Sequence, residues 1–520
     1  MSAAPLPSLP RGFRGDAVTD PHHLLGWAGA SGPFWRPPGA VLRPSDTGDV
    51  ALILPWARNH GLALVPRGAG TGMPGGNVGH DVVLDLSALR SVSEPIDPTE
   101  GAVRVGAGTV GAEVRRTVQA AGLDLPALPS SAPWATVGGM VACNAAGARS
   151  LRYGSIRDWV DALTVVLTDG SVRTLHRGGG HSEDPWRRVW TRLETALPNP
   201  LPWPAVRKNS SGYALDRAIT SGDALDLVVG SEGTLGVVTE AVVKAEPPPA
   251  HRAVILLGVP DRAELPSRVA LLRDDPLVLA CEYFGRRLVE LGDLAGDPRL
   301  EGLHAGDGLL LVELGGPPVE VESRVRALSR APSGGAVSAM DPEGMEALWE
   351  TRHAANPVLG RALAQGRRST QFIEDCVVPP TRVHDFLTGL DHILDEHRTQ
   401  AVVFGHVGDG NLHVNPLVDL TRSGWREEVR AILEDTVELV AGLGGTLAGE
   451  HGDGRLRTPY LHRFFDPDVI HAFGTVKAIL DPAGILNPGV IVPVPGMDPL
   501  EGLGDAPAFA SGTQGPEGVR

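Results

Sequence analysis

The sequence predicts an α+β protein of two domains, and three observations support this prediction. Its 520 residues are too many for one simple hydrophobic core. Short strand-like runs alternate with helical ones from residue 41 onward. A proline run, Pro247–Pro249, interrupts the alternation and is typical of a domain boundary. We therefore expect four parts: an irregular segment over 1–40, domains over 41–248 and 249–493, and a disordered tail over 494–520.

In the first domain, the predicted elements are bounded by residues that start or stop them. Residues 46–61 predict a helix that Asp46 can cap and Gly61 can end. Residues 161–175 predict a hairpin, and 226–248 predict two strands around a glycine turn. The other expected elements are a short helix near 22–28, strands over 63–68, 81–89 and 102–108, and a helix over 109–122.

The second domain is predicted from longer helical runs and from three apolar strands. Its helical runs have apolar residues at helical spacing, and its strands are short and almost wholly apolar. Strands are expected over 253–259, 308–314 and 401–407, and helices over 261–274, 318–330, 381–397 and 426–444.

Charge and cysteine content weigh against several classes of function. A formal net charge of −16 is unsuited to nucleic acid, because binding phosphates requires a basic face. The three cysteines are far apart and form no C-x-x-C pair, which argues against an iron–sulfur cluster, a zinc ribbon or a disulfide framework. We see no signal peptide and no apolar run of the ~20 residues that a membrane span needs. We expect a cytoplasmic protein, with peripheral contact at the inner membrane left open.

A glycine-rich loop over 66–77, PRGAGTGMPGGN, is the first candidate binding site. Glycines let backbone N–H groups approach an anion such as a diphosphate closely. Residues 70–75 match G-x-G-x-x-G, but a Rossmann loop must open a helix, whereas here Pro74 intervenes and a strand follows. On its own, the loop could equally be a surface turn. Two further runs of small residues, over 128–147 and 230–238, suit a flat ring pressed against the backbone.

The order of these motifs resembles the FAD domain of the vanillyl-alcohol-oxidase superfamily. The motifs are PRGAGTG, ATVGGMVACNAAG followed by RYGSIRD, KNSSGY and VVGSEGTLGVVTE, and the resemblance extends over 40–490. It implies a two-part PCMH-type FAD-binding domain and then an α+β substrate (cap) domain with an antiparallel sheet, the C-terminal type of FAD-linked oxidases. No histidine lies within 66–77 or 128–147, so we expect non-covalent FAD. The implied FAD contacts are Pro66, Arg67, Gly68, Ala69, Gly70, Thr71, Gly72, Ser130, Ser131, Thr136, Gly138, Gly139, Asn144, Gly147, Glu232, Gly233, Val237, Val238 and Asn487.

Histidines and carboxylates gather in two motifs of the second domain, GHVGDGNLHVN over 405–415 and AGEHGDG over 448–454. Neutral imidazoles with a carboxylate are usual ligands of a divalent cation such as Zn²⁺, and three protein ligands leave positions open for substrate. A single loop histidine is more often a polar loop residue. Several of them in glycine-rich turns favour a metal site, because glycines let the loops come close.

These motifs resemble the FAD-dependent D-2-hydroxyacid dehydrogenases, which include D-lactate dehydrogenase, D-2-hydroxyglutarate dehydrogenase and the flavin subunit of glycolate oxidase. The resemblance implies that His406, His413 and Glu450 are the metal ligands. It also implies that Asn415 contacts the substrate and that His451 acts as the base.

The chemistry that the resemblance implies is oxidation of a small D-2-hydroxy acid to the 2-keto acid. The segment LWETRHAAN over 348–356 resembles the stretch that supplies an arginine for the substrate carboxylate, here Arg352. A bound metal would lower the pKa of the substrate hydroxyl, His451 would remove its proton, and hydride would pass to flavin N5. Asp409 or Asp453 is either a partner of a ligand histidine or a turn residue.

Two departures from the family leave the substrate open among D-lactate, glycolate and D-2-hydroxyglutarate. Asn356 stands where the family has a threonine. Ile373 stands where D-2-hydroxyglutarate dehydrogenases have a lysine, with Arg367 or Arg368 as its candidate substitute. The contact to a second substrate carboxylate is therefore in doubt.

Other functions on the same fold also stay open. They are an oxidase that passes electrons to O₂, a non-catalytic flavin subunit, and alkyl-dihydroxyacetone-phosphate synthase. The synthase uses adjacent histidines, which the second domain lacks, and a non-catalytic subunit would be expected to lose the metal ligands. Without an iron–sulfur motif in this chain, electrons must leave to a separate iron–sulfur subunit, a quinone or an electron-transfer flavoprotein. A homodimer is left open as well.

Overall fold

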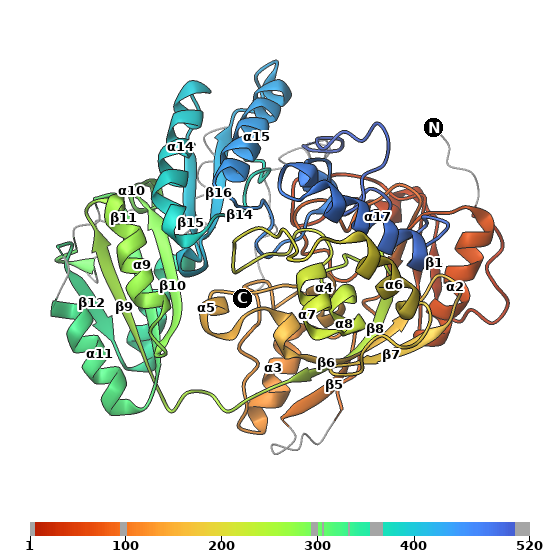
Figure 1. Ribbon diagram of the computed structural model, residues 1–520, viewed down its shortest axis with the longest axis horizontal. Coiled ribbons are helices and arrows are strands. Elements are labelled where there is room, and N and C mark those ends of the chain that lie inside the picture. Colours follow the sequence, from red (N-terminus) through yellow and green to blue (C-terminus); the bar gives the residue numbers. More distant parts are fainter. Residues whose placement is uncertain are drawn as a thin grey trace, which may run out of the picture.

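The computed structural model describes residues 6–93, 101–292, 300–303, 306–330, 333–353 and 368–504. Within these ranges the strands form three sheets, two of four strands and one of eight. Figure 1 shows the smaller sheets in one half of the molecule and the large sheet in the other. The mixture of helices with largely antiparallel sheets confirms the predicted α+β class.

The first small sheet contains the strand that leads into the glycine-rich loop. Its order is β1-β2-β4-β3, with β2 and β3 parallel to β4 and β1 antiparallel to β2. Helix α2 covers it, and the predicted boundaries are confirmed: Asp46 caps the helix and Gly61 ends it in a left-handed conformation. The bounds are β1 (Asp16–Val18), β2 (Ala40–Arg43), β3 (Leu64–Arg67), β4 (Val82–Asp85), α1 (Pro21–Leu24) and α2 (Thr47–His60).

The second small sheet is antiparallel, in the order β5-β8-β6-β7, and contains the predicted hairpin as β6 and β7. One expected strand is wrong: residues 224–228 form helix α8 instead. All five residues of α8 are buried, and a short run buried on every side does not reveal whether it is strand or helix. The bounds are β5 (Ala102–Gly106), β6 (Val160–Val166), β7 (Val172–His176), β8 (Val237–Lys244), α3 (Gly111–Ala120), α4 (Val137–Cys143), α5 (Ser150–Tyr153), α6 (Trp186–Ala196), α7 (Leu215–Ser221) and α8 (Ala224–Val228).

The large sheet has the order β12-β9-β11-β10-β15-β16-β13, with β14 also paired to β16. Every pairing in it is antiparallel, as expected for the second domain. The four predicted helices are confirmed as α9, α11, α14 and α15, whereas β10 and β16 were not predicted. The bounds are β9 (His251–Val259), β10 (Val278–Gly285), β11 (Gly308–Gly316), β12 (Ala336–Ala339), β13 (Arg368–Ser369), β14 (Cys376–Val377), β15 (Ala401–Gly405), β16 (Asn411–Val418), α9 (Leu265–Arg273), α10 (Arg286–Leu291), α11 (Pro318–Arg330), α12 (Pro342–His353), α14 (Val383–Glu396) and α15 (Trp425–Gly442).

The chain returns to the first half after α15. Helix α17 (Pro467–Leu480) packs beside α6, and its Phe473 ring contacts the buried ring of Tyr213. In Figure 1 the blue α17 lies among the red and yellow elements. Leu486 then forms a parallel bridge to Leu64 at the edge of β3. Residues that the sequence division assigns to 249–493 therefore complete the cores of the first half.

The sequence predicted disorder from residue 494 onward, but ordered structure continues beyond that residue. Leu503 is fully buried and pairs with Phe34, while Glu501 forms an ion pair of 2.6 Å with Arg36. These contacts join segments more than 450 residues apart, so no local pattern reveals them. The expectation of disorder is wrong for residues 494–504, and 505–520 lie outside the described residues.

Replacing Leu503 by Ala should therefore destabilise the protein. Truncating a fully buried leucine typically costs about 2–5 kcal/mol of unfolding free energy. The matched control is Val494→Ala, because Val494 is 44% exposed, and surface substitutions usually stay within about 0.5 kcal/mol. Denaturant unfolding of both variants measures this, and equal stability of the two would show that the segment does not contribute to the core.

Candidate active site

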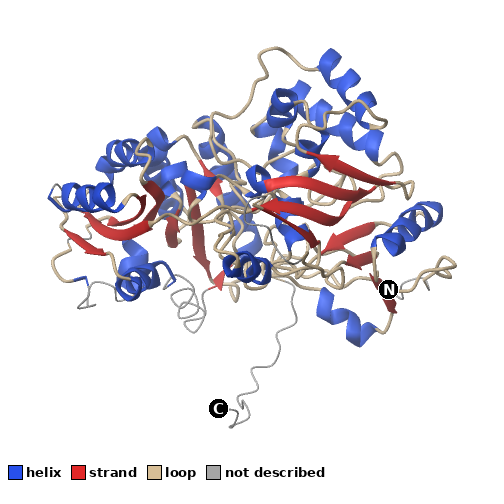
Figure 2. Ribbon diagram, turned by 90° about the horizontal axis from the view of Figure 1, so that it is seen from below, coloured by secondary structure: helices blue, strands red, loops and turns tan. Residues whose placement is uncertain are grey.

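A cavity of about 1040 Å³ runs from the glycine-rich loop to a cluster of histidines and carboxylates. Figure 2 shows the loops of the molecule gathered between its two groups of strands. The wall of the cavity comes from all three small-residue runs, and its far end comes from α12 and the two histidine motifs. The predicted cofactor residues on this wall are Pro66, Arg67, Gly68, Ala69, Gly70, Thr71, Gly72, Ser130, Ser131, Thr136, Gly138, Gly139, Gly147, Glu232, Gly233, Val237 and Val238.

Glycines are required where segments of these runs pack against each other, both between two runs and within one. A Cβ on Gly68 would lie 2.1 Å from Oγ1 of Thr136, and one on Gly147 would lie 2.2 Å from the carbonyl oxygen of Leu128. Both distances are far shorter than a van der Waals contact, so side chains here would push the walls apart. The cradle is therefore shaped by backbone, as a large flat cofactor requires.

Two predicted FAD contacts, Asn144 and Asn487, do not line the cavity. Asn144 ends α4 in a left-handed conformation, and its side-chain oxygen accepts a hydrogen bond from Ser155. The amide of Asn487 donates to the carbonyl oxygens of Gly76 and Glu232 at 2.7 and 2.9 Å. Both side chains hold neighbouring loops together in this structure.

Arg67 and Glu232 line the cavity, but their charged groups brace the surrounding loops. The Arg67 guanidinium donates to carbonyl oxygens of Trp27, Gly29 and Asn77. The Glu232 carboxylate accepts hydrogen bonds from the backbone of the second histidine motif, at residues 453 and 454. Burial and the nearby Asp453 raise the pKa of Glu232 to about 8.

The predicted metal ligands converge on one point. The Nε2 atoms of His406 and His413 lie 3.0 and 3.3 Å from Oε1 of Glu450 and 3.4 Å from each other. All three side chains are buried. The opposite ring nitrogens are also bonded, Nδ1 of His406 to Glu282 at 2.6 Å and Nδ1 of His413 to the carbonyl oxygen of Glu374 at 3.0 Å. Two imidazoles and a carboxylate, with the opposite ring nitrogens held by hydrogen bonds, suit a divalent cation.

A buried lysine lies against this cluster. Nζ of Lys208 forms an ion pair of 2.6 Å with Oε2 of Glu450. Burial works to raise the pKa of Glu450, but the charges of Lys208 and His406 hold it well below its usual range. The lowered pKa keeps Glu450 in its ionised form.

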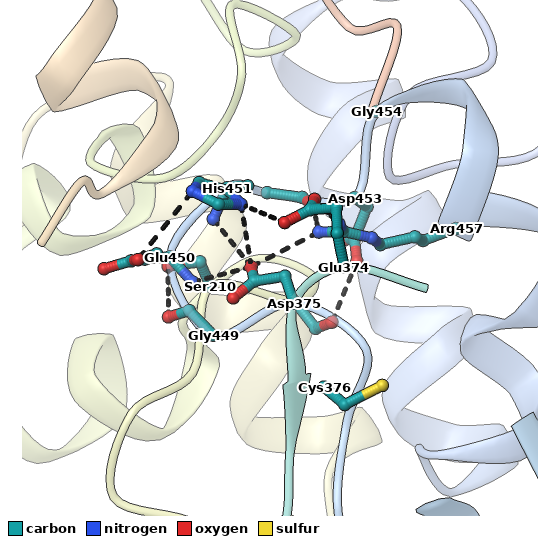
Figure 3. A network of polar contacts seen from close by, with 12 residues as sticks. Ser210, Glu374, Asp375, Cys376, Gly449, Glu450, His451, Asp453, Gly454 and Arg457 are labelled. Atoms are coloured by element: carbon teal, nitrogen blue, oxygen red, sulfur yellow. Dashed lines mark hydrogen bonds and ion pairs between the residues drawn. The ribbon is translucent and has the colours of Figure 1, made fainter. Parts of the chain in front are cut away.

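The predicted base, His451, is held by a network of buried charges. Its Nδ1 lies 2.7 Å from Oε2 of Glu374, and its Nε2 lies 3.7 Å from Oε1 of Glu450. Oδ2 of Asp375 accepts hydrogen bonds of 2.9 Å from both backbone N–H groups of residues 450 and 451. Figure 3 shows these side chains together with Arg457, which forms ion pairs with both acids. Burial works to lower the pKa of His451, but the two carboxylates outweigh it and raise the pKa to about 9.

Arg352, the predicted carboxylate-binding residue, lies on the cavity wall beside Trp349. Its Nε donates to Oε2 of Glu282 at 3.1 Å, and its guanidinium lies 4.4 Å above the Phe404 ring. Burial works to raise the pKa of Glu282, but His406 and Arg352 lower it to about 2.

Asn415 lies two residues after His413 on β16, hence on the same face of the strand. Its side-chain oxygen accepts a hydrogen bond from Ser369 at 3.1 Å, and like His413 it is not among the residues that line the cavity. The structure thus brings five predicted site residues together, four of them on the cavity wall and His413 directly behind it, and places Asn415 next to them.

Several charged residues of the site were not predicted: Lys208, Glu282, Glu374, Asp375 and Arg457. The available signal was a carboxylate inside an apolar strand for Glu282, and adjacent acids before an apolar run for Glu374 and Asp375. Asp409 and Asp453 were left open, and among the described contacts they bind Ser150 and Ser211 rather than a ligand histidine. Asn356, Arg367 and the side chain of Arg368 lie outside the described residues, and Ile373 is buried in the core.

A backbone-lined cavity that ends at an imidazole and carboxylate cluster suits an enzyme that holds a large flat cofactor beside a polar catalytic site. In agreement, residues 38–176 match the FAD binding domain, and 248–491 match the C-terminal domain of FAD linked oxidases. The glycolate oxidase subunit GlcD of Bacillus subtilis is 31% identical over 466 residues, which cover 87% of this chain and 88% of that protein. The chain belongs to the FAD-linked oxidase family and is an FAD-dependent oxidoreductase.

Other relatives agree with this assignment, and a solved structure agrees with the fold. D-lactate dehydrogenase of Archaeoglobus fulgidus is 29% identical over 87% of this chain and 91% of its own. D-2-hydroxyglutarate dehydrogenase of Escherichia coli is 29% identical over 94% of this chain, which spans only 51% of that protein. The structure of p-cresol methylhydroxylase with substrate bound superposes on this chain with a TM-score of 0.66 and 15% identity, covering 92% of this chain and 94% of that one. At this identity it supports the fold alone. None of the helices in the described part of the chain has the length and apolarity that crossing a bilayer requires.

Proposed function

We propose that this protein oxidises a small D-2-hydroxy acid to the 2-keto acid, using non-covalent FAD and a divalent cation. The observation that carries the proposal is the convergence of His406, His413 and Glu450 at the end of the cavity, beside Arg352 and His451. The relatives named for glycolate, D-lactate and D-2-hydroxyglutarate support the substrate class. The imidazole and carboxylate donors suit Zn²⁺.

Both groups fit the residues present. The glycines at positions where an added Cβ would clash form a cradle for FAD. FAD, when bound, supplies the acceptor for the C2 hydride. The three convergent donors would hold the cation, which when bound supplies Lewis-acid polarisation of the substrate hydroxyl. Electrons then leave to a separate acceptor, an iron–sulfur subunit, a quinone or an electron-transfer flavoprotein.

The protein's own residues have distinct roles in this proposal. Arg352 binds the substrate carboxylate, and Asn415 contacts the substrate from β16. Because Nδ1 of His451 faces the Glu374 carboxylate, Nδ1 carries a proton and Nε2 is the atom that takes up the hydroxyl proton. The carboxylates around His451 raise its pKa and favour its protonated form, whereas positive charge bound at Glu450, 3.7 Å away, would favour its neutral form.

Anaerobic reduction of the bound flavin tests the proposal. We expect one of D-lactate, glycolate and D-2-hydroxyglutarate to bleach the visible flavin absorbance, L-lactate to fail, and prior EDTA treatment to abolish the bleaching. A bound metal stabilises the transition state by several kcal/mol, and each ~1.4 kcal/mol is a tenfold change in rate. Removing the metal with EDTA should therefore abolish the bleaching. Readdition of Zn²⁺ is the control. A flavin-loaded protein that no hydroxy acid bleaches would contradict the proposal, and bleaching insensitive to EDTA would contradict the metal alone. Reoxidation by air then measures whether O₂ is an acceptor.

A further inference from the structure

We infer that Glu282 is a positioning residue that couples the metal ligand His406 to the substrate arginine Arg352. The inference rests on the proposed function for the roles of those two residues. One carboxylate, buried between the metal ligand and the substrate arginine, sets the direction of both side chains.

The strand register places Glu282 against His406. In the antiparallel pair of β10 and β15, Tyr283 lies opposite Gly405, so the next positions along the two strands are Glu282 and His406. Glu282 is the one charged residue of β10 and is completely buried. A buried carboxylate is expensive unless its oxygens are paired, and an apolar residue at this position would pack the sheet as well. The charge therefore serves something other than the sheet.

Each oxygen of Glu282 has one partner in the site. Oε1 lies 2.6 Å from Nδ1 of His406, and Oε2 lies 3.1 Å from Nε of Arg352. A carboxylate can only accept hydrogen bonds, so Nδ1 of His406 must carry the proton. With Nδ1 protonated, Nε2 is the atom whose lone pair would be offered to a cation bound between His406, Glu450 and His413.

The same carboxylate orients the arginine. The ion pair engages Nε of Arg352 and leaves its terminal nitrogens out of this contact. The Phe404 ring lies 4.4 Å from the guanidinium and restrains its plane. Phe404 lies on β15, two residues before His406, so arginine and metal ligand share one support. Movement of Glu282 would therefore disturb the carboxylate site and the metal site together.

Glu282→Gln tests this coupling in the flavin-loaded protein. An amide has one acceptor oxygen, so its NH₂ group must face the N–H of His406 or of Arg352. We expect Zn²⁺ affinity, measured by competition with a metal-binding dye, to fall about 10–100-fold, as for loss of other partners of ligand histidines. The KM for the hydroxy acid should rise with it. Glu282→Asp keeps both acceptors at shorter reach and should recover part of both losses.

The matched control is Asp275→Asn. Asp275 precedes β10, is nearly as buried, and forms an ion pair of 2.7 Å with Arg324 away from the site. The Asp275→Asn substitution should leave Zn²⁺ affinity and KM unchanged. Wild-type Zn²⁺ affinity and KM in Glu282→Gln would overturn the inference, as would equal losses in Asp275→Asn or no recovery in Glu282→Asp. A wild-type protein that binds no Zn²⁺ would instead contradict the metal in the proposed function.

Discussion

Replacing His413 by Asn is expected to remove hydroxy-acid oxidation while FAD stays bound. The substitution deletes the Nε2 donor that lies 3.3 Å from Glu450, so two ligands remain for the cation. His413 does not line the cavity, so the cofactor wall is unchanged. We expect kcat/KM to fall by at least ~10³-fold, since a lost Lewis acid removes several kcal/mol and each ~1.4 kcal/mol is tenfold.

The control for this result is His397→Asn. His397 follows α14 and pairs with Asp435 of α15 near the surface, and it contacts neither histidine motif among the described contacts. The His397→Asn protein should therefore keep its activity and metal content. Metal analysis and flavin absorbance of the purified variants separate the causes. Full activity in a metal-free His413→Asn protein would rule out the metal in catalysis. Loss of FAD together with metal would instead mean that His413 supports the cavity.

Replacing Gly147 by Ala is expected to weaken FAD binding. The new Cβ would lie 2.2 Å from the Leu128 carbonyl oxygen, which belongs to backbone and cannot rotate away. Overpacking of this kind typically costs about 1–3 kcal/mol, which corresponds to about 5–150-fold in affinity. The measurement is the FAD content after purification, followed by titration of the apoprotein with FAD.

Gly474→Ala is the matched control, because a Cβ there meets no atom within 4 Å. Gly474 lies within α17, where alanine is the better helix former, so stability should hold or increase. Unchanged FAD affinity in Gly147→Ala would show that the backbone at Leu128 can move to accommodate the methyl group. An unfolded Gly147→Ala protein would show that the position serves the core, and the cradle would then be tested at Gly68.

Local signals predicted much of the fold. The cap at Asp46, the stop at Gly61 and the turn of the β6–β7 hairpin act within a few residues, so their patterns are readable in sequence. The short buried helix α8 shows the limit of such patterns. Its run of buried residues has no polar face to set a period.

The site was predicted by its motifs rather than by its elements. Glycines around His406 and His413 indicated turns, yet His413 lies within β16, a strand in which every residue is buried. The partners of the histidines could not be predicted, because Glu282 is 124 residues from His406 and Glu374 is 77 residues from His451. Such pairs depend on strand register and loop packing, which one sequence does not reveal.

The return of the chain to the first half has a consequence for its synthesis. Ile485 and Leu486 belong to the core around β2 and β4, and α17 belongs to the core around β5–β8. Neither core is complete until the ribosome has translated α17 and residues 485–486, although N-terminal domains generally fold first during synthesis. The nascent N-terminal half must therefore keep apolar surface exposed until then, which makes a fragment ending at residue 248 a poor candidate for separate expression.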